Sequence, residues 1–580
     1  MINPYTRFKF KRFLRRSRST PVRIAKFFND NVFASSKKHA KIRKFSLMWL
    51  AVVFVIFGAT ATQALLERRT ILVSVPSNGG THREAVVGDL DNFNPLFAVD
   101  GANADVSRLL FAGLVEYSPE GELIGELAES WESNDSADTF TVKLKPNLSW
   151  HDGSKLTAED IAFTINLIQN PDTRSPLKET WRGIQVQVID ELTVTFKLPN
   201  PFAPFPQLLT VGILPQHIVK DIDPANLRIS NFAVSPVGSG VFELQEFDTA
   251  QNRIIMTAFD NYAQGEARLS RLIIRGYTTI DDARDALKQK LVDGLGSVDR
   301  LEGYSEEDGY QNSEPKLAIG NYMLFNSSKS LFSDAKLRKA LTKAVNVSTL
   351  QQNVESPKPE LRSVFLPSQL RATDPVNQLS FDASQAAKDL SAIGWKSANG
   401  TRNKDGRMLQ FDLAVADRES TVAIAERIKE QLGAVGVIVT IQKTPVEDYQ
   451  TDVVLPHKYD ALLVSLTNGI DPDVFVFWHS SQAQPGGLNF SEIEDEELDS
   501  ALEAGRTRTD RELREAKYKA FAERWQKLAP GVAINQEQYH YVRRNRAKGP
   551  LPKVFLQPKD RFNTVEKWTV LFNNVERKNL

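Results

Sequence analysis

The sequence predicts an α/β fold of two lobes, preceded by one N-terminal transmembrane helix. Three observations support this prediction. The chain has 580 residues, which is too long for one ordinary hydrophobic core and favours two or more domains. Its first half contains strands with an alternating apolar pattern, whereas its second half alternates strands with helices. One apolar segment without charged residues lies near the N-terminus, at residues 45–66.

The apolar segment reads FSLMWLAVVFVIFGATATQALL, and its 22 residues are enough to span a bilayer as a helix. Residues 1–44 precede it with 14 lysines and arginines against one acid, Asp30. The positive-inside rule places such a basic segment in the cytoplasm and the body outside it. The expected location is therefore the cell membrane, with a single pass and an extracytoplasmic body.

A cleaved signal peptide is the alternative interpretation of the same segment. Its strongly apolar part, residues 45–58, is short, and Ala59, Thr60 and Ala61 supply the small residues of a cleavage site. A basic leader of 44 residues is much longer than that of the usual signal peptide, which favours the anchor. The cleaved form would be secreted, so both interpretations put the body outside the cytoplasm.

The composition of the body excludes several classes of function. Beyond residue 44 the chain holds 58 Lys and Arg against 71 Asp and Glu, so the body is mildly acidic although the whole chain has zero net charge. This balance argues against nucleic-acid binding by the body. The sequence contains no cysteine, which excludes disulfides, thiol catalysis and zinc–thiolate sites. No cysteine can carry a lipid either, so the helix itself must supply any membrane attachment.

The first half of the body is expected to be rich in strands. Residues 66–80 predict a short exit from the membrane, and residues 81–97 predict a strand followed by a turn-rich loop. Three further segments have apolar residues at every second position, the pattern of a half-buried strand. These segments are residues 138–146, 192–199 and 253–259.

The second half predicts layers of helices and strands. Residues 409–416 have the pattern of a strand, residues 420–436 that of an amphipathic helix, and residues 437–442 that of a β-branched strand. Such a βαβ unit requires parallel pairing and a right-handed crossover. Another strand is expected over residues 459–466, and a long helix over residues 510–528, where a proline two positions later ends it.

Residues 148–171, LSWHDGSKLTAEDIAFTINLIQNP, concentrate acidic, basic and aromatic side chains. Local architecture explains them. The Asp-Gly pair that begins at Asp152 suits a tight turn, and Thr157 with Asp160 three residues later forms an approximate capping box for a helix. His151 has no third partner nearby that would orient it as a base. We therefore interpret the stretch as the corner between a strand and a helix, not as a catalytic site.

Six segments resemble, in their order and spacing, the family 5 extracytoplasmic solute-binding proteins, the oligopeptide- and dipeptide-binding receptors of ABC importers. The first is GLVEYSPEGELIGELAESWESNDSADTFTVKLKPNLSWHDGSKLTAEDIAFTINLI, and SPVGSGVFELQEFDTAQNRIIMTAFDNY follows it. The resemblance extends over roughly residues 85–548, nearly the whole body. The six segments are residues 113–168, 235–262, 322–350, 470–481, 488–505 and 529–534.

The resemblance implies a two-lobed periplasmic-binding-protein-like (class II) fold with a hinge. Lobe I would comprise residues 72–320 plus 530–580, and lobe II residues 321–529. The ligand would be enclosed between the lobes, which close because it contacts both of them. The implied partners are a peptide or other small solute and an ABC permease in the same membrane, with no cofactor and no bound metal.

In peptide-binding members of the family, a carboxylate shortly before the Asp-Pro motif pairs with the α-ammonium group of the peptide. The corresponding position in this chain is Asn468, counted back from Asp471. An amide accepts a hydrogen bond from an ammonium group but cannot neutralise it. The family often has a tryptophan just before this site, where the chain has Leu466. These departures keep a neutral, blocked or otherwise decorated ligand open.

The resemblance marks further candidate residues for substrate binding. Trp478 is a candidate for stacking on the ligand, with a core aromatic as the alternative. Asn489 is a candidate contact, with a cap of the following turn as the alternative. Asp471 and Asp473 are interpreted as turn-formers and helix caps. Four consecutive residues form the loop that approaches the ligand in this family, with a solvated loop as the alternative: Asp100, Gly101, Ala102 and Asn103.

The sequence fits other classes of function less well or leaves them open. An enzyme is not expected, because the chain has no Gly-x-Ser-x-Gly motif and none of its seven histidines forms a His-x-x-x-His pair. A receptor for a metal chelate stays open, since such a ligand brings its own coordinating groups. A membrane-tethered ligand-sensing protein also stays open. The sequence thus predicts a membrane-anchored substrate-binding protein of an ABC importer, with peptides as the expected solute.

Overall fold

The structure is a computed structural model of the chain, and it describes residues 39–298, 301, 303–352, 357–370 and 375–576. It divides into two compact units, one of Met1–Pro76 with Phe572–Leu580 and one of Ser77–Leu571. Most of the basic N-terminal segment, residues 1–38, lies outside the described residues.

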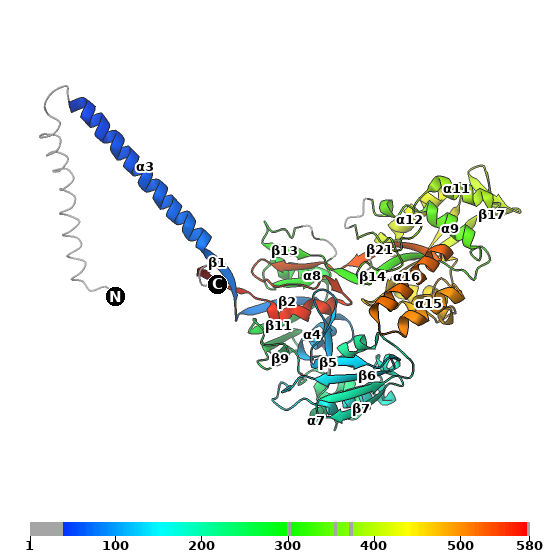
Figure 1. The fold of residues 1–580 in the computed structure, drawn as a ribbon, viewed down its shortest axis with the longest axis horizontal. Coiled ribbons are helices and arrows are strands. Elements are labelled where there is room, and N and C mark those ends of the chain that lie inside the picture. Colours follow the sequence, from blue (N-terminus) through cyan, green and yellow to red (C-terminus); the bar gives the residue numbers. More distant parts are fainter. Residues whose placement is uncertain (1–38, 299–300, 302, 353–356, 371–374, 577–580) are drawn as a thin grey trace. The chain divides into compact units, whose positions relative to one another are not determined.

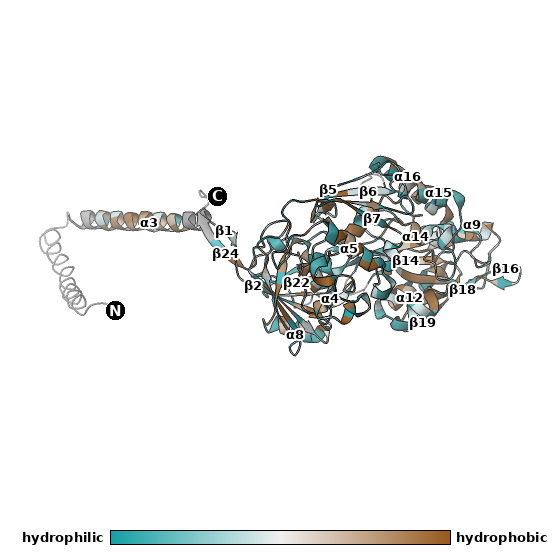
Figure 2. Cartoon of the chain, turned by 90° about the horizontal axis from the view of Figure 1, so that it is seen from below, coloured by the Kyte–Doolittle hydropathy of each residue, from teal (hydrophilic) through white to brown (hydrophobic). Residues whose placement is uncertain are grey.

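The first unit is built on one long helix, α3 (His39–Ile71). Within it, Lys44–Leu65 has a mean hydropathy of 2.0 and is long and apolar enough to cross a membrane, by length and composition. These residues rise about 33 Å, close to the thickness of a bilayer core. Figure 2 shows the hydrophobic residues along this helix.

The helix α3 runs farther than the sequence predicts. It continues without a break through the small residues at 59–61 and ends only at Ile71, where a short exit from the membrane was expected. The strand β1 (Leu72–Ser77) follows at once and pairs with β24 (Leu571–Glu576), near the C-terminus.

A seven-stranded sheet, here called the first sheet, opens the second unit (Figure 1). Its central strand β2 runs parallel to β11 and to β12, and the remaining pairs are antiparallel. The strand expected within residues 81–97 is β2. In spatial order the sheet contains β13 (Tyr310–Ser313), β22 (Tyr541–Arg544), β12 (Gly294–Gly296), β2 (Thr81–Val87), β11 (Arg271–Tyr277), β10 (Arg253–Ala258) and β9 (Phe242–Asp248).

A four-stranded antiparallel sheet contains two of the predicted alternating segments. Phe140, Val142 and Leu144 are buried, at most 3% exposed, so the period-two pattern is confirmed. The first and four-stranded sheets share one hydrophobic core, here called the first core. The four strands are β5 (Ala128–Ser133), β6 (Thr139–Leu144), β8 (Thr193–Lys197) and β7 (Gln185–Asp190). A separate pair joins β3 (Val115–Tyr117) and β4 (Leu123–Gly125).

A six-stranded sheet, here called the second sheet, contains the predicted βαβ unit. The strands β18 and β19 run parallel, with α12 between them in the chain. The sheet contains β19 (Ile438–Thr444), β18 (Gln410–Ala416), β20 (Ala461–Thr467), β14 (Lys316–Phe325) and β21 (Gly531–Gln538), and β23 (Val554–Phe555) pairs with β14. A small three-stranded sheet holds β15 (Lys396–Ala398), β16 (Thr401–Lys404) and β17 (Arg407–Met408).

Both faces of the second sheet are covered. Along β14, Tyr322 and Leu324 enter one hydrophobic cluster, whereas Met323 and Phe325 enter another. The first cluster includes buried residues of α16 and the second includes those of α12. A sheet buried on both faces needs near-continuous apolar strands, which β14 and β20 provide.

The helices of the second unit lie mainly over these sheets. The α-helices in chain order are α4 (Gly101–Leu110), α5 (Ala158–Gln169), α6 (Lys178–Trp181), α7 (Gln216–Val219), α8 (Ile280–Lys288), α9 (Ala335–Ala344), α10 (Val347–Leu350), α11 (Ala383–Ala392), α12 (Glu419–Ala434), α13 (Val446–Tyr449), α14 (Phe475–Trp478), α15 (Glu496–Arg506) and α16 (Arg511–Leu528). The 3-10 helices are η1 (Pro171–Thr173), η2 (Phe205–Thr210), η3 (Pro224–Ile229), η4 (Asn231–Ala233), η6 (Ser480–Gln482) and η7 (Pro558–Lys567), and η5 (Gln450–Val454) is a π-helix.

Of the connections between the first sheet and the second, two are neighbours in space. The chain passes from β13 into β14, and it returns from β21 into β22. In the first sheet β13 pairs with β22, and in the second β14 pairs with β21, so both connections lie side by side. A pair of adjacent crossing segments is a suitable hinge. We propose that the chain divides into its two lobes at residues 320/321 and 529/530.

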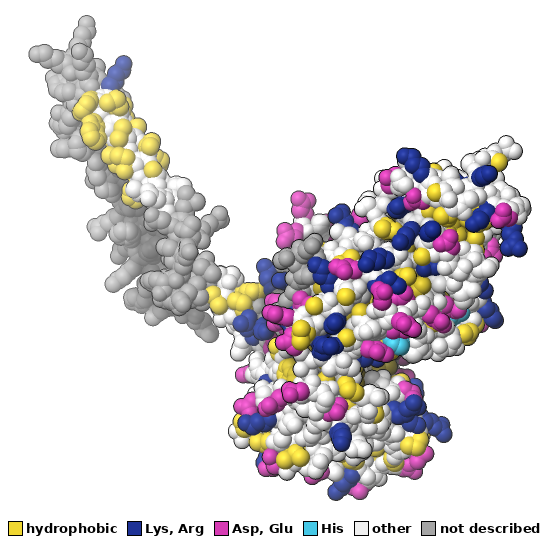
Figure 3. Space-filling model, turned by 45° about the vertical axis from the view of Figure 1, so that its right-hand side comes forward, with side chains coloured by type: hydrophobic (Ala, Val, Ile, Leu, Met, Phe, Trp, Pro, Cys, Tyr) yellow, Lys and Arg dark blue, Asp and Glu magenta, His cyan; other side chains and the backbone are white. Residues whose placement is uncertain are grey.

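The surface of the second unit carries mixed charge. Figure 3 shows basic and acidic side chains interspersed on the face that it presents, without a large field of one sign. Such a face is unsuited to gripping a phosphate backbone.

Candidate functional site

Strands of both sheets meet at a cavity of about 390 Å³, here called the central cavity. The first sheet contributes the end of β2 and Gly296 of β12. The second sheet contributes Leu317 and Ile319 of β14 and Thr467, the last residue of β20. Walls from two sheets that are joined by a pair of crossing segments make this cavity the candidate site.

A side cavity adjoins the central one, and an outer cavity adjoins the side cavity. The side cavity of about 240 Å³ shares Ala104, Gln557 and Lys559 with the central one. The outer cavity of about 510 Å³ shares Tyr117 and Gln207 with the side cavity. The three cavities are therefore neighbours in the second unit. The central and outer cavities have the size of small-molecule and cofactor sites, and the side cavity is somewhat smaller.

The predicted ligand loop lies at the central cavity. Asp100, Gly101 and Ala102 line it at the start of α4. Asp100 is exposed and its side chain makes no cap hydrogen bond. Gly101 has φ of +65°, a left-handed conformation that favours glycine, and open space surrounds the position of an added Cβ atom. The backbone of this loop is thus open to a ligand.

Asn103 has a different position. Its side-chain oxygen accepts hydrogen bonds from the backbone N–H groups of Asp91 (3.0 Å) and Asn92 (3.2 Å). Its amide nitrogen donates to the Asp91 carboxylate at 2.7 Å. All these contacts tie the loop to the preceding segment, so Asn103 holds the loop in place.

Asn468 lies beside the central cavity, immediately after Thr467. The side chain is 4% exposed and its Nδ2 donates to the Tyr322 hydroxyl at 2.8 Å. Its Oδ1 is buried without a hydrogen-bond partner among the described residues. The backbone carbonyl accepts from Nε2 of Gln369 at 3.0 Å. The amide is thus paired with a neutral hydroxyl, and its ligand role stays a proposal.

Trp478 and Asn489 lie together in the core over the second sheet. Trp478 is 1% exposed and packs edge-on against Tyr322 and Trp525, with ring centres 6.4 and 5.7 Å apart. Asn489 is fully buried, and its amide donates to the backbone carbonyls of Trp478 (3.3 Å) and Ile493 (3.0 Å). These contacts give both residues a packing role in this structure.

The two aspartates around Pro472 act on the local backbone, as expected. Asp471 accepts a hydrogen bond from the N–H of Asp473 at 2.9 Å, and Asp473 accepts one from the N–H of Phe475 at 3.3 Å. Both carboxylates also bind arginines. Asp471 receives two bonds from Arg514, at 2.7 and 2.8 Å, and Asp473 receives one from Arg506 at 3.0 Å.

A buried ionic network that the sequence did not reveal supports the central cavity. Arg561 donates to both carboxylate oxygens of Asp105, at 2.7 and 2.8 Å, and to Glu84 at 3.0 Å. Glu84 also contacts His82 (2.9 Å) and the Tyr541 hydroxyl (2.8 Å). Burial opposes the charge of Glu84, but His82 and Arg561 outweigh it and lower the pKa. The bonds from Arg561 to Asp105 and Glu84 thus join η7 to α4 and β2.

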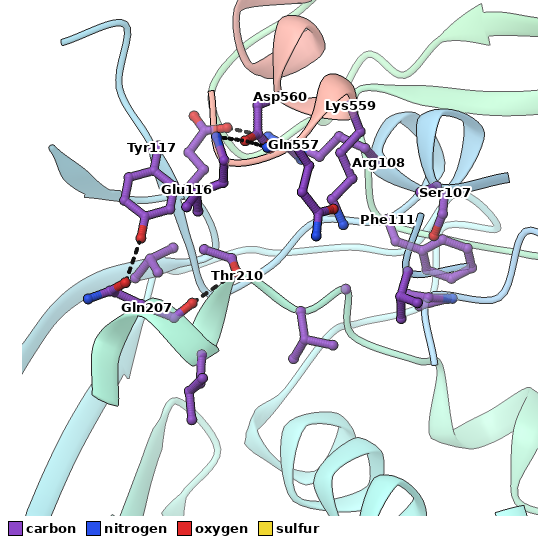
Figure 4. Close-up of a pocket in the computed structure, with 18 of the residues that line it drawn as sticks. Ser107, Arg108, Phe111, Glu116, Tyr117, Gln207, Thr210, Gln557, Lys559 and Asp560 are labelled. Atoms are coloured by element: carbon purple, nitrogen blue, oxygen red, sulfur yellow. Dashed lines mark hydrogen bonds and ion pairs between the residues drawn. The ribbon is translucent and has the colours of Figure 1, made fainter. Parts of the chain in front are cut away.

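A second buried cluster lines the side cavity, shown in Figure 4. Arg108 donates to Glu126 at 2.7 Å and also pairs with Glu116. Tyr262 donates to Glu126 at 2.7 Å, and Gln264 donates to Glu116. Burial, reinforced by the Glu126 carboxylate, raises the pKa of Glu116 to about 8. Glu116 therefore retains its proton near neutral pH.

Lys559 lines both the central and the side cavity. No hydrogen bond or ion pair joins its ammonium group to another side chain in the described part of the chain. Burial lowers the pKa of Lys559, and the positive charge of Arg108 acts in the same direction. In Figure 4 Lys559 and Gln557 extend from the η7 segment at the edge of the side cavity.

The stretch at residues 148–171 is the predicted corner. The N–H of Thr157 donates to Asp160 Oδ2 at 2.9 Å, which forms the capping box of α5. His151 accepts from the N–H of Gly238 at 3.2 Å and donates to the carbonyl of Gly240 at 3.1 Å. Burial lowers the pKa of His151 to about 4. Its neutral ring joins two backbone segments, which is an architectural role.

One serine, aspartate and histidine meet on the surface near this corner. Asp152 Oδ2 and Ser154 Oγ lie 2.8 and 3.1 Å from the same ring nitrogen of His217, Nε2. A catalytic relay needs the acid and the nucleophile on opposite ring nitrogens. This trio therefore lacks that arrangement. Among the described residues, no group of three or more histidines or acids is placed to hold a metal ion.

Comparisons with known proteins give a consistent picture. The family model described as "Bacterial extracellular solute-binding proteins, family 5 Middle" matches residues 122–487. The oligopeptide-binding protein AppA of Bacillus subtilis is 26% identical over 552 residues, which are 91% of this chain and 99% of that protein. The oligopeptide-binding protein OppA of Mycobacterium tuberculosis is 24% identical over 469 residues, 77% of each chain.

Solved structures share the fold. AppA from Bacillus subtilis in complex with a nonapeptide has a TM-score of 0.64 and 23% identity, and covers 86% of this chain and 100% of that one. The substrate-binding protein CtaP of Listeria monocytogenes has a TM-score of 0.73 and 23% identity, at 85% and 100% coverage. NikZ from Campylobacter jejuni with Ni(L-His) has a TM-score of 0.67 and 23% identity, at 84% and 99% coverage. The predicted periplasmic-binding-protein-like α/β fold is confirmed.

Proposed function

The chain belongs to family 5 of the bacterial extracellular solute-binding proteins, and from this premise we propose that it delivers peptides to an ABC importer. The observation that supports this most is the central cavity, which strands of both sheets bound. The relatives named for peptide binding support the choice of peptides as the solute.

The proposed mechanism is enclosure without chemistry. The loop at Asp100–Ala102 faces the cavity from the side of the first sheet, and Thr467 faces it from the second. A solute that contacts both walls stabilises the closed arrangement, because only that arrangement provides both sets of contacts. The solute leaves unchanged when the permease opens the protein, so we assign no catalytic residue.

We further propose that α3 anchors the protein in the cell membrane with residues 1–44 in the cytoplasm. Its apolar side chains support this, since Phe54 is 82% and Phe57 is 76% exposed in the absence of lipid. Burial in hydrocarbon would satisfy this surface. The tether would keep the binding unit close to its permease.

Mass spectrometry of the solute released from the full chain tests the proposal. The protein is purified from membranes in detergent without chelator, denatured, and its small molecules are identified. Peptides that copurify in near-stoichiometric amount are expected. Recovery of a metal complex instead of peptides would show that the solute is a metal chelate. Recovery of a signalling kinase without a permease in the same preparation would favour a sensor.

A further inference from the structure

We propose that Lys559 determines specificity by binding an anionic group of the solute, so that the cleft selects ligands with a free carboxylate. The inference rests on the proposed function and adds the chemical class of the recognised group. It arises from three features: the position of Lys559 on the cavity wall, the engagement of its acidic neighbours, and the neutral pair at Asn468, next to Thr467 of the wall.

The position of Lys559 is fixed on both sides. Asp560 follows it, and its carboxylate accepts hydrogen bonds from the N–H groups of Leu556 (2.7 Å) and Gln557 (2.9 Å). Arg561 comes next and is held by Asp105 and Glu84. The backbone at Lys559 therefore has little freedom. Its side chain extends from a rigid support to the junction of the central and side cavities.

The acids nearest to Lys559 are already engaged. Both carboxylate oxygens of Asp105 accept hydrogen bonds from Arg561. The carboxylate of Asp560 accepts one from the N–H of Leu556, just before η7. Asp100 raises the pKa of Lys559 by its charge, but it lies exposed at the loop and no ion pair joins the two. A partly buried ammonium group without a partner is unfavourable, and an anion in the cavity would compensate it.

The amino-terminal ammonium group of a free peptide would find no charged partner at Asn468. Where an ammonium group would need a carboxylate, Asn468 and Tyr322 form a neutral pair at 2.8 Å. Two carboxylates line the central cavity: Asp105 is bound to Arg561, and Asp100 is exposed to solvent. Among the described residues that line the central cavity, the partly buried charge that lacks an ion pair is thus the positive charge of Lys559. This asymmetry favours recognition of the carboxylate over recognition of the amino group.

Mixed-sequence peptide libraries of three to nine residues test the proposal in four forms. One form has free termini, the second is N-acetylated, the third is C-amidated, and the fourth carries both blocks. Binding to the full chain in detergent is measured by competition and by mass spectrometry of the retained peptides. Loss of a charge-assisted contact predicts that C-amidation weakens binding about 10- to 100-fold. N-acetylation should change binding by much less.

Variants at position 559 separate this contact from general effects. Lys559→Gln should bind the acid and amide forms equally, whereas Lys559→Arg should retain the preference. Lys553→Gln removes an exposed lysine in the same segment and should behave as wild type. A thermal melt of each variant shows whether it folds, and the comparison of acid with amide is made within one variant.

The outcomes separate the two proposals. Equal binding of acid and amide forms by the wild-type chain would overturn the role of Lys559 and leave peptide binding intact. A preference that persists in Lys559→Gln would overturn it as well. Failure of all four forms to bind would overturn the peptide function, and the inference with it.

Discussion

The guanidinium of Arg506 lies over the ring of Phe202, 5.2 Å from its centre. Phe202 packs against the first core, whereas Arg506 is the last residue of α15, which packs over the second sheet. The ring of Phe475 lies on Arg506 as well, at 3.9 Å. The N–H of Ala203 donates to the carbonyl of Arg506 at 2.8 Å. This group joins the two parts of the protein that bound the cavities.

Phe202→Ala should therefore weaken closure. The change removes one cation–π contact, about 1 kcal/mol, from the arrangement in which both parts meet. We expect peptide affinity to fall about fivefold with little change in the unfolding temperature. Isothermal titration against the free-termini library measures the effect. Lys519→Ala, which removes an exposed lysine from α16, is the control. Equal affinities for Phe202→Ala and wild type would contradict the role of this contact.

Asn468→Asp should strengthen binding of peptides with a free amino group. The new carboxylate would be buried next to the Tyr322 hydroxyl, so the unliganded protein should lose about 1–3 kcal/mol at neutral pH. A ligand ammonium group would compensate this charge, and an acetylated one would not. Affinity for free and N-acetylated libraries is compared in both proteins. No change in their ratio would count against this placement of the amino-terminal site.

Glu116 predicts a specific dependence of stability on pH. Its pKa is raised by burial from 4.5 to about 8, so the folded protein binds a proton that the unfolded chain has lost between these values. The contribution of this group to stability is therefore complete below pH 4.5 and is lost as pH rises through about 8. The side chain of Glu116→Gln has no proton to release, so this variant should not lose stability in this way as pH rises.

Urea denaturation at pH 5, 7 and 9 measures this effect. The free energy of unfolding of Glu116→Gln minus that of wild type should increase with pH across this range. Glu129→Gln, at an exposed position of β5, should leave the difference constant and serves as control. A difference that does not vary with pH would show that Glu116 is ionised throughout.

Charged residues in the middle of α3 test the anchor. Val53→Lys combined with Phe54→Lys places two charges near the centre of the apolar span, at about 2.5–3.5 kcal/mol each. We expect the protein to leave the membrane fraction. Thr62→Lys lies near the end of the span, where the side chain can reach the interface, and should remain bound. Intact mass separates the anchor from cleavage, because a retained helix preserves the full 65.0 kDa.

Local patterns predicted much of the fold. Alternation located β6 and β8, and the strand–helix–strand pattern located β18, α12 and β19, because burial of one face imposes a period on the sequence. The capping box of α5 was also visible, since its partners are three residues apart.

The cavity walls could not be predicted in the same way. Arg561 and Asp105 are separated by 456 residues, and no local pattern marks such a pair. No pattern in the sequence marks Lys559. It becomes a candidate only because the structure shows that the acidic residues near it are bound to other groups. The aromatic at position 478 resembles a ligand platform as much as a core residue until its packing on Trp525 is known.

The central claim is that a solute closes the protein between its two sheets. Because the chain has no cysteine, spin labels attach only at introduced positions. Asp135→Cys beside β6 and Glu430→Cys on α12 place exposed labels on the two sides. Double electron–electron resonance with and without saturating peptide library measures the distance between them. We predict a shorter and narrower distance distribution with peptide. Peptide bound at full occupancy with an unchanged distribution would contradict the account.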